Sequence, residues 1–389
     1  MDPAALKRSW AAVVRHGDAV PSFFYAILFM AHPQLRSMFP MSMAAQRDRL
    51  VSALGRIVSN VDQIDAAVPF VQGLGRDHRR FDVRAEHYPM VGDALLRTLA
   101  HFLGEAWTPQ LAEDWGAAYQ LVAQVMSEAA ERSAASTPAY WTATVVGHER
   151  RGLDIAVVQL HPKQPYPYVA GQSCAMEIPD RPRLWRYYSP ANLPRPDGRI
   201  DLHVKAVPGG QISTAIVHGL QPGDVVKLSA PVGQQLTLAP GATRDLLLLA
   251  GGTGLAPLKA LVEQVAAEGG RRRVTLIVGA RTQPDLYDLP AFEALARQAG
   301  WLTVVPALSH DPWYPGERGT VGEVAQRLGR WHDHDVYVCG SAEMTTATRE
   351  ALLAGGVPAE QIRCEDYNND PYRPMAGDAV TELEEVPTR

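Results

Sequence analysis

Apolar residues recur every three or four positions in the first third of the chain, which is the spacing of one face of a helix. The repeat is clearest at Ala44–Ser59, Tyr88–Leu103 and Leu111–Ala130. We therefore expect residues 1–137 to form amphipathic helices with short connections.

After residue 137 the chain changes to short apolar runs between prolines and glycines. Residues 1–137 hold seven of the 30 prolines and residues 138–389 hold 23, and proline is poorly tolerated inside helices and central strands. Apolar and polar residues alternate at Thr142–Val146, Ile155–Leu160 and Ile200–Val204. This period of two predicts an antiparallel β domain.

The last part of the chain has a different strand pattern. Leu246–Ala250 is apolar without alternation, as is typical of a parallel strand that is buried on both faces. Further strands are expected at Val274–Val278, Thr303–Pro306 and Asp335–Val338, with helices between them such as Leu258–Glu268. Strands that alternate with helices predict a doubly wound parallel sheet.

These patterns divide the chain into three domains. The small, polar segment SAASTP at Ser133–Pro138 has the composition of a linker. The expected divisions are an all-α domain at residues 1–133, a linker at 134–139, an antiparallel β domain at 140–241, an α/β domain at 242–370 and a tail at 371–389.

Composition narrows the classes of function. A net charge of −5 gives no basic surface for nucleic acid. The longest apolar stretch, Phe23–Ala31, is about half of the ~20 residues that a membrane span needs, and no signal peptide pattern opens the chain. Cys174, Cys339 and Cys364 are too scattered for a disulfide framework or a thiolate metal site. We expect a cytoplasmic monomer that acts on small molecules.

Periodicity alone does not separate a helical bundle from a globin, but specific residues of the helical domain do. Polar and aromatic side chains stand at fixed spacings, and His78 follows Gln46 by thirty-two residues. The set resembles the globin domain of bacterial flavohaemoglobins. It comprises Tyr25, His32-Pro33, Phe39, Gln46-Arg47-x-x-Leu50, His78, His87-Tyr88-Pro89-x-Val91-Gly92 and Trp115-Gly116-x-x-Tyr119.

The resemblance implies a haem b whose iron is bound by the imidazole of His78, with His87 as the competing candidate. A neutral ring nitrogen is the form that ligates iron. Tyr88 and a glutamate of the last helix would polarise this histidine from behind, which favours oxygen activation over storage. We expect the glutamate to be Glu131, with Glu128 as the alternative.

On the other side of the haem, the resemblance implies a pair of hydrogen-bond donors for dioxygen, Tyr25 and Gln46. Such donors stabilise developing negative charge in a dry cavity. Phe39 and Leu50 would form the wall of this pocket. Tyr25 is the most informative of the four, because its hydroxyl interrupts an apolar run and a buried hydroxyl needs a partner.

The β domain carries two motifs of the ferredoxin-reductase family of FAD barrels. In that family an arginine clasps the pyrophosphate, a tyrosine stacks on the flavin, and a glycine-rich helix start offers N–H groups to phosphate. The resemblance implies an FAD-binding β-barrel. The two motifs are Arg186-Tyr187-Tyr188-Ser189 and Gly209-Gly210-Gln211-x-Ser213-Thr214.

The α/β domain resembles the NAD(P)-binding module of the same reductases. Its glycines let the backbone turn tightly and approach a pyrophosphate at a helix N-terminus. Cys339 is expected beside the nicotinamide, although a small buried residue without a chemical role is the alternative, and Tyr367 stands where the family has an aromatic residue that shields FAD. The motifs are Gly251-Gly252-Thr253-Gly254-x-Ala256-Pro257 and Cys339-Gly340-Ser341-x-x-Met344.

Two further parts of the sequence bear on the haem potential and on the choice of coenzyme. Relatives carry lysine directly before the axial histidine, whereas Asp77 precedes His78 here, and we expect this charge reversal to affect the haem potential or the domain interface. Arg281 and Thr282 would meet the 2′-phosphate of NADPH, but Asp285 opposes it. We expect NADH to be preferred over NADPH.

The three modules imply one electron path, from NAD(P)H to FAD and from FAD to haem. The expected reaction is the oxidation of nitric oxide to nitrate with dioxygen, that is, a nitric oxide dioxygenase. Two alternatives remain. In the first, the globin is a haem-based gas sensor or oxygen-binding module that its own reductase keeps reduced. In the second, the protein is an enzyme that reduces organic hydroperoxides.

Overall fold

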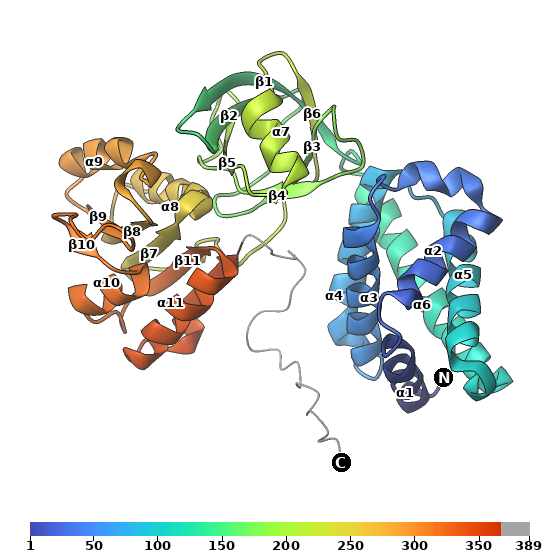
Figure 1. Cartoon of the computed structure of the whole chain (residues 1–389). Helices are drawn as coiled ribbons and strands as arrows, with labels where there is room; N and C mark the ends of the chain where they lie inside the picture. The colour runs from blue at the N-terminus through green and yellow to red at the C-terminus, as the bar shows by residue number, and fades with distance from the viewer. Residues whose placement is uncertain (367–389) are drawn as a thin grey trace. The chain divides into compact units, whose positions relative to one another are not determined.

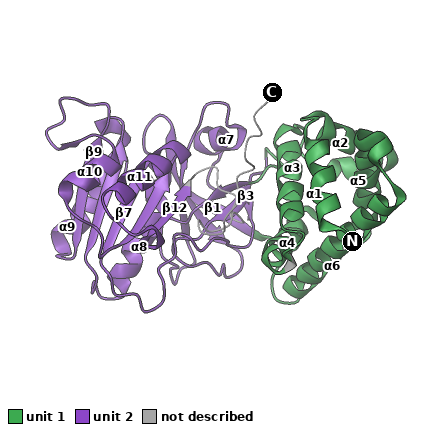
Figure 2. Cartoon of the chain, turned by 90° about the horizontal axis from the view of Figure 1, so that it is seen from below, with its two compact units in different colours: residues 1–141, 180–185 green, residues 142–179, 186–389 purple. Residues whose placement is uncertain are grey.

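The computed structural model describes residues 1–366, and the chain divides by its internal contacts into two compact units. The first unit contains residues 1–141 and 180–185, and the second contains residues 142–179 and the chain from 186 onward (Figures 1 and 2). Tyr367 and the predicted tail at 371–389 lie outside the described residues.

The first unit is helical, as the periodicity predicts. The three helices foreseen from the sequence are confirmed, and α3 has the predicted bounds. Short 3-10 turns follow α2, α4 and α5. The helices are α1 (Pro3–Val14), α2 (Ala19–Ala31), α3 (Ala44–Ser59), α4 (Ile64–His78), α5 (His87–Leu103) and α6 (Pro109–Ala134).

Local sequence explains where these helices begin and how they pack. Asp2 accepts hydrogen bonds from the backbone of α1, and Thr108 does the same for α6 before a proline in its first turn. Gly75 lets α4 lie directly on α6, because a Cβ there would clash with the backbone of Met126. The close approach of α4 to α6 fixes the end of α4, which carries His78.

The second unit begins with a six-stranded antiparallel sheet in the order β4-β3-β6-β1-β2-β5. Pro190, just after β4, bridges to Leu202 of β5, so the sheet nearly closes into the predicted barrel. Helix α7 (Gln211–Gly219) follows β5. The strands are β1 (Trp141–Arg150), β2 (Ile155–Pro162), β3 (Cys174–Glu177), β4 (Arg186–Tyr188), β5 (Ile200–Lys205) and β6 (Val225–Leu228).

The rest of the unit is a parallel sheet in the order β10-β9-β8-β7-β11-β12. Helices α8 (Leu255–Ala267), α9 (Leu289–Gln298), α10 (Val321–Leu328) and α11 (Ala342–Ala354) cover it (Figure 1). The strands are β7 (Leu246–Gly251), β8 (Val274–Ala280), β9 (Leu302–Leu308), β10 (Glu317–Arg318), β11 (Asp335–Gly340) and β12 (Ile362–Asp366).

The leucines of β7 show why this sheet is doubly wound. Leu246 and Leu248 belong to one apolar core with α8 and α9, while Leu247 and Leu249 belong to another with α10 and α11. All four are fully buried, and successive strand residues point to opposite faces. The predicted fold class is therefore confirmed in each of its three parts. No helix within residues 1–366 is long and apolar enough to cross a membrane.

Candidate functional sites

Tyr25 and Gln46 come together in the helical unit. Tyr25 lies on α2 and is buried, and its hydroxyl has a side-chain hydrogen bond with Gln46 of α3. Burial raises the pKa of Tyr25 to about 12, although the contact with Gln46 lowers it in part. The phenol therefore keeps its proton at neutral pH and can donate a hydrogen bond.

Aromatic and aliphatic side chains enclose this polar pair. The ring of Phe39 meets that of Tyr25 edge to face, with the centroids 5.5 Å apart. Leu50, one turn after Gln46 on α3, packs against the same core. A hydroxyl and an amide beside apolar side chains are the kind of polar groups that orient a small ligand in a protein site.

His78 is the last residue of α4, and its ring is held by the helix. The Nδ1 atom lies 2.7 Å from the carbonyl oxygen of Leu74, so Nδ1 carries the proton and donates it to that oxygen. Burial is the main cause that lowers the pKa of His78. The result is a neutral imidazole with an oriented Nε2 lone pair, which is the donor that haem iron requires. The residues present therefore fit a histidine-ligated haem.

Tyr88 has a different partner from the one that the resemblance implies. Its hydroxyl has a side-chain hydrogen bond with Ser127 of α6, and its carbonyl oxygen accepts one from the hydroxyl of Tyr119 at 2.6 Å. Glu131 is exposed on α6, and Glu128 is exposed and accepts a hydrogen bond from Gln124. A catalytic role for Glu131 stays a proposal, and its exposed side chain does not favour it.

Sequence reasoning missed Ser127, although the signal was present. Counting from Trp115 leads to Ala130, and Ser127 lies one helical turn earlier on the same face. The resemblance implies a carboxylate on this helix, and it therefore does not point to a hydroxyl.

The negative charge at Asp77 is compensated inside the helical unit. Its Oδ2 lies 3.3 Å from Nη2 of Arg80, and both side chains are about nine-tenths buried. The guanidinium of Arg80 lies over the rings of Phe81 and Trp185, 5.1 Å from each centroid. The expected charge reversal beside His78 is therefore partly cancelled by an arginine that sequence reasoning did not assign.

The first reductase motif lies on β4 and directly after it. Arg186 is exposed at the start of the strand and its charge acts on Tyr188, while burial raises the pKa of Tyr188. Tyr187 pairs with Ala175 across the sheet, and Ser189 follows at the strand end. Burial therefore favours the protonated form of the Tyr188 phenol, and the side chain of Arg186 lies exposed at the start of the strand.

The second reductase motif forms the start of α7. Gly209 has a φ of +75°, which favours glycine. Gly210 is the N-cap residue, Gln211 opens the helix, and the amide of Thr214 already bonds to the carbonyl of Gly210. Ser213 is buried, and its Oγ accepts a hydrogen bond from the Val207 amide. Free amides at the first turn fit a phosphate, as the motif predicts.

The nucleotide motif sits between β7 and α8 as a single 3-10 turn, Gly252–Gly254. Gly252 has a φ of +53°, and a Cβ at Gly254 would clash with the carbonyl of Cys339 at the end of β11. Ala256 and Pro257 are buried in the first turn of α8, and Thr253 lies half-buried between the glycines. The turn and Cys339, which is also buried, thus meet at the carboxyl edge of the sheet.

Met344, the last residue of the second nucleotide motif, packs against two glycines. It lies on α11, and its sulfur lies against the Cα positions of both Gly251 and Gly340, where a Cβ would clash with it. Two glycines and a methionine from three elements therefore form one contact. Arg281 is exposed just after β8, and Thr282 and Asp285 bond to each other in a capping box.

Comparisons with known protein families match most of the chain. A globin family model matches residues 22–126, an oxidoreductase FAD-binding domain matches 142–236, and an oxidoreductase NAD-binding domain matches 248–350.

Two relatives match this chain over nearly their whole length. The chain is 27% identical over 384 residues to a protein of Bacillus subtilis (strain 168) named flavohemoprotein, covering 92% of this chain and 95% of the relative. A solved flavohemoglobin of Malassezia yamatoensis with bound FAD and heme has a TM-score of 0.76 at 20% identity, over 94% of this chain and 98% of that one.

A further solved structure matches part of the chain. It is the flavohem-like FAD/NAD-binding domain of a nitric oxide dioxygenase from Vibrio cholerae O1 biovar El Tor, with a TM-score of 0.51 at 21% identity. The match covers 58% of this chain and 98% of that one. At these identities the two solved structures establish the fold.

Proposed function

This chain belongs to the flavohaemoprotein family, and from that premise we propose that it is a NAD(P)H-dependent nitric oxide dioxygenase, which converts nitric oxide and dioxygen to nitrate. At the coarser level it is an oxidoreductase with haem, FAD and a nicotinamide nucleotide as cofactors. When bound, haem supplies the iron for oxygen chemistry, and FAD divides the two electrons of a hydride into single ones.

The pair of Tyr25, which is buried, and Gln46, which is half-buried, carries the proposal. The pKa of about 12 keeps the Tyr25 hydroxyl protonated, so it donates a hydrogen bond wherever negative charge develops on dioxygen. The side-chain contact with Gln46 holds that hydroxyl in place, and the ring of Phe39 packs against the ring of Tyr25. Preorganised donors in a dry site are usually the largest single contribution to such stabilisation.

His78 would hold the iron of the haem. The hydrogen bond from its Nδ1 to the Leu74 carbonyl orients the ring and raises the basicity of Nε2. A backbone carbonyl is a weaker polarising group than a carboxylate, and Tyr88 bonds to the neutral Ser127. We infer that the proximal residues would donate less electron density to the iron than the glutamate-containing arrangement that the resemblance implies.

The reductase half supplies electrons through residues that bind and orient its cofactors. Arg186, the amides at the start of α7 and the glycine turn before α8 each fit one phosphate-bearing group. The name of the Vibrio cholerae structure as part of a nitric oxide dioxygenase supports the same reaction. NADH is the proposed donor. Asp285 bonds to Thr282 at the end of β8, and its negative charge would oppose the 2′-phosphate of NADPH.

Single-turnover mixing tests the proposal. The purified protein is reduced with NADH, equilibrated with dioxygen and mixed with nitric oxide in a stopped-flow instrument, and nitrate is measured in the quenched product. We expect one nitrate for each nitric oxide consumed, at a rate close to the diffusional limit. A slow reaction, or nitrite without nitrate, contradicts the proposal. Rapid turnover of an organic hydroperoxide in its place would identify the enzyme as a hydroperoxide reductase.

A further inference from the structure

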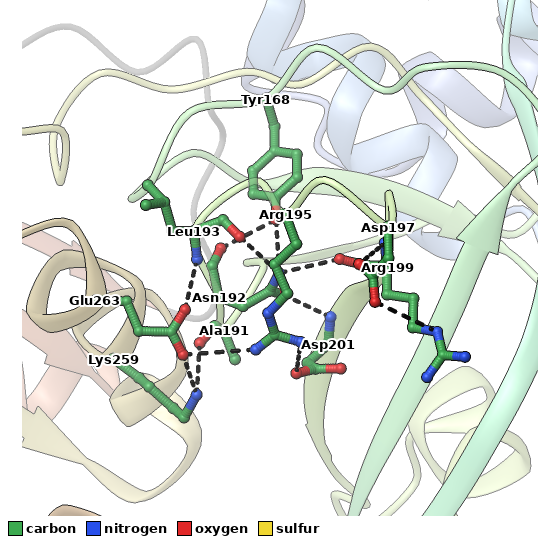
Figure 3. A network of polar contacts seen from close by, with 10 residues as sticks. All are labelled: Tyr168, Ala191, Asn192, Leu193, Arg195, Asp197, Arg199, Asp201, Lys259 and Glu263. Carbon is green, nitrogen blue, oxygen red and sulfur yellow. Dashed lines mark hydrogen bonds and ion pairs between the residues drawn. The ribbon is translucent and has the colours of Figure 1, made fainter. Parts of the chain in front are cut away.

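A cluster of polar side chains joins the FAD barrel to the nucleotide-binding sheet inside the second unit (Figure 3). One part of it is the loop of residues 190–199, which directly follows Ser189 of the flavin motif. The other part is α8, which directly follows the glycine turn of the nucleotide motif. The cluster therefore connects the two segments that lead away from the two cofactor sites.

Glu263 of α8 is the centre of this cluster. Its carboxylate accepts hydrogen bonds from Lys259 Nζ at 2.7 Å and from the Leu193 amide at 2.9 Å. The guanidinium of Arg195 lies 3.6 Å from the same carboxylate and 2.8 Å from Oδ2 of Asp201. Lys259 also donates to the carbonyl of Ala191 at 3.3 Å. Two cations and two carboxylates thus balance each other across the two domains.

The barrel side of the cluster is rigid. Asn192 is fully buried, and its side-chain amide donates to the hydroxyl of Tyr168 and to the carbonyls of Leu193 and Arg199 at 2.8–3.0 Å. Its carbonyl oxygen accepts from the Asp201 amide at 2.7 Å. Both ends of this side chain are satisfied, so the loop presents Leu193 and Arg195 to α8 in one conformation.

A second polar contact supports the same interface. His203 of β5 lies 2.8 Å from the hydroxyl of Tyr287, which belongs to the nucleotide-binding domain. Ile155, Ala170 and Leu236 of the barrel belong to the same apolar core as α8. Apolar contact supplies the attraction between the domains. Lys259, Glu263 and Arg195 are only partly buried, so the ion cluster supplies little net free energy and mainly fixes which groups face each other.

We propose that Glu263 and Arg195 are positioning residues for hydride transfer from the nicotinamide nucleotide to FAD. They tie α8, whose N-terminus follows the nucleotide turn, to the loop that follows the flavin motif. A displacement of about 1 Å between reacting groups can cost on the order of a hundredfold in rate. This inference rests on the electron path of the proposed function but not on nitric oxide as the substrate.

The test uses the full-length holoenzyme with Glu263→Gln. This change keeps an oxygen for the Leu193 amide and removes the charge that faces Lys259 and Arg195. Anaerobic stopped-flow mixing with NADH gives the rate constant of flavin reduction, the NADH dissociation constant and the long-wavelength charge-transfer absorbance. We expect the rate constant to fall about tenfold and the charge-transfer absorbance to weaken, with FAD content and NADH affinity within about twofold of the wild type.

Glu268→Gln is the matched control, because Glu268 is exposed just after the same helix and bonds to Gln264. It should leave every readout unchanged. The double variant Arg195→Gln with Glu263→Gln should reduce flavin no more slowly than the slower single variant, because both substitutions disrupt the same contact. Hydrogen exchange of the 190–199 backbone should quicken in Glu263→Gln and not in the control.

A rate constant within twofold of the wild type in Glu263→Gln overturns the proposal. If this variant fails to retain FAD, Arg195→Lys replaces it, since lysine keeps the charge but loses the two-pronged contact. A wild-type rate there overturns the proposal equally. The assay contains neither nitric oxide nor dioxygen, so its outcome is independent of whether nitrate is the product.

Discussion

Tyr88 of α5 and Ser127 of α6 share a side-chain hydrogen bond in the helical unit. A neutral hydroxyl polarises a neighbouring group less than a carboxylate does. On the proximal side of the haem that we propose, Tyr88 therefore polarises the iron ligand less than it would with a carboxylate partner. Two predictions about the haem follow from this contact and from the geometry of His78.

Ala130→Glu should lower the reduction potential of the haem. It places a carboxylate one turn from Ser127, on the face of α6 that meets Tyr88, and negative charge near the iron ligand favours the ferric form. A tenfold shift of a one-electron equilibrium corresponds to about 59 mV, and we expect a fall of roughly this size in a spectroelectrochemical titration. Gln120→Glu, an exposed position on the same helix, should leave the potential unchanged. An equal fall in both variants would contradict the assignment.

His78→Ala should remove most of the haem and leave FAD bound. The helical unit and the reductase unit are separate compact bodies, so the loss of an iron ligand in one does not empty the other. The measurement is the ratio of Soret absorbance to flavin released by acid. His87→Ala is the control, because the ring of His87 accepts a hydrogen bond from the Arg84 amide. If His87→Ala loses haem and His78→Ala does not, the ligand assignment is reversed.

NADH should be the preferred coenzyme by at least tenfold in kcat/KM, which is about 1.4 kcal/mol. Asp285 bonds to both the amide and the hydroxyl of Thr282, so its charge stays close to the end of β8, where a 2′-phosphate would bind. Asp285→Asn keeps one such bond and removes the repulsion, and the preference for NADH should shrink. An NADPH preference in the wild type that Arg281→Ala abolishes would make Arg281 the phosphate-binding residue.

Acid should destabilise the reductase unit through His203. Burial is the largest cause that lowers the pKa of His203 from 6.5 to about 3. The unfolded chain therefore binds a proton that the folded chain excludes, and stability is lost as pH falls from 6.5 toward 3. The slope is at most about 1.4 kcal/mol per pH unit.

His203→Gln removes this proton uptake, so its denaturant midpoint, followed by FAD fluorescence, should depend less steeply on pH between 6.5 and 4. The comparison is between slopes, because the variant also loses the contact with Tyr287. His332→Gln, at an exposed site, should keep the wild-type slope. Identical slopes in all three proteins would show that His203 does not couple protonation to unfolding.

The sequence predicted the fold well because each segment has one dominant period. The 3.6-residue repeat of Ala44–Ser59 and the unbroken apolar run of Leu246–Ala250 each admit a single element, and both elements form. The short strands β3 and β6 were not foreseen, because four residues carry too little periodicity. The close approach of α4 to α6 at Gly75 depends on tertiary packing that no local pattern encodes.

The sites divide in the same way. Glycine turns before helices are local, so the nucleotide turn before α8 and the start of α7 form where the motifs predict. Partners on different helices are not local. The contact of Tyr88 with Ser127 and the contacts of Glu263 with Leu193 and Arg195 join residues that lie far apart in the sequence, so they depend on how helices and loops pack. Local sequence patterns do not predict such pairs.

The stoichiometry of the complete reaction is a direct test of nitric oxide dioxygenation. Two molecules of nitric oxide and two of dioxygen should be consumed for each NADH, and two of nitrate should appear, because each turnover needs one electron and a hydride supplies two. Tyr25→Phe should cut nitrate formation roughly 10- to 100-fold while NADH-driven flavin reduction is unchanged, and Tyr140→Phe, at an exposed tyrosine, should change neither. NADH consumption that nitric oxide does not accelerate, or full nitrate formation by Tyr25→Phe, would contradict the account.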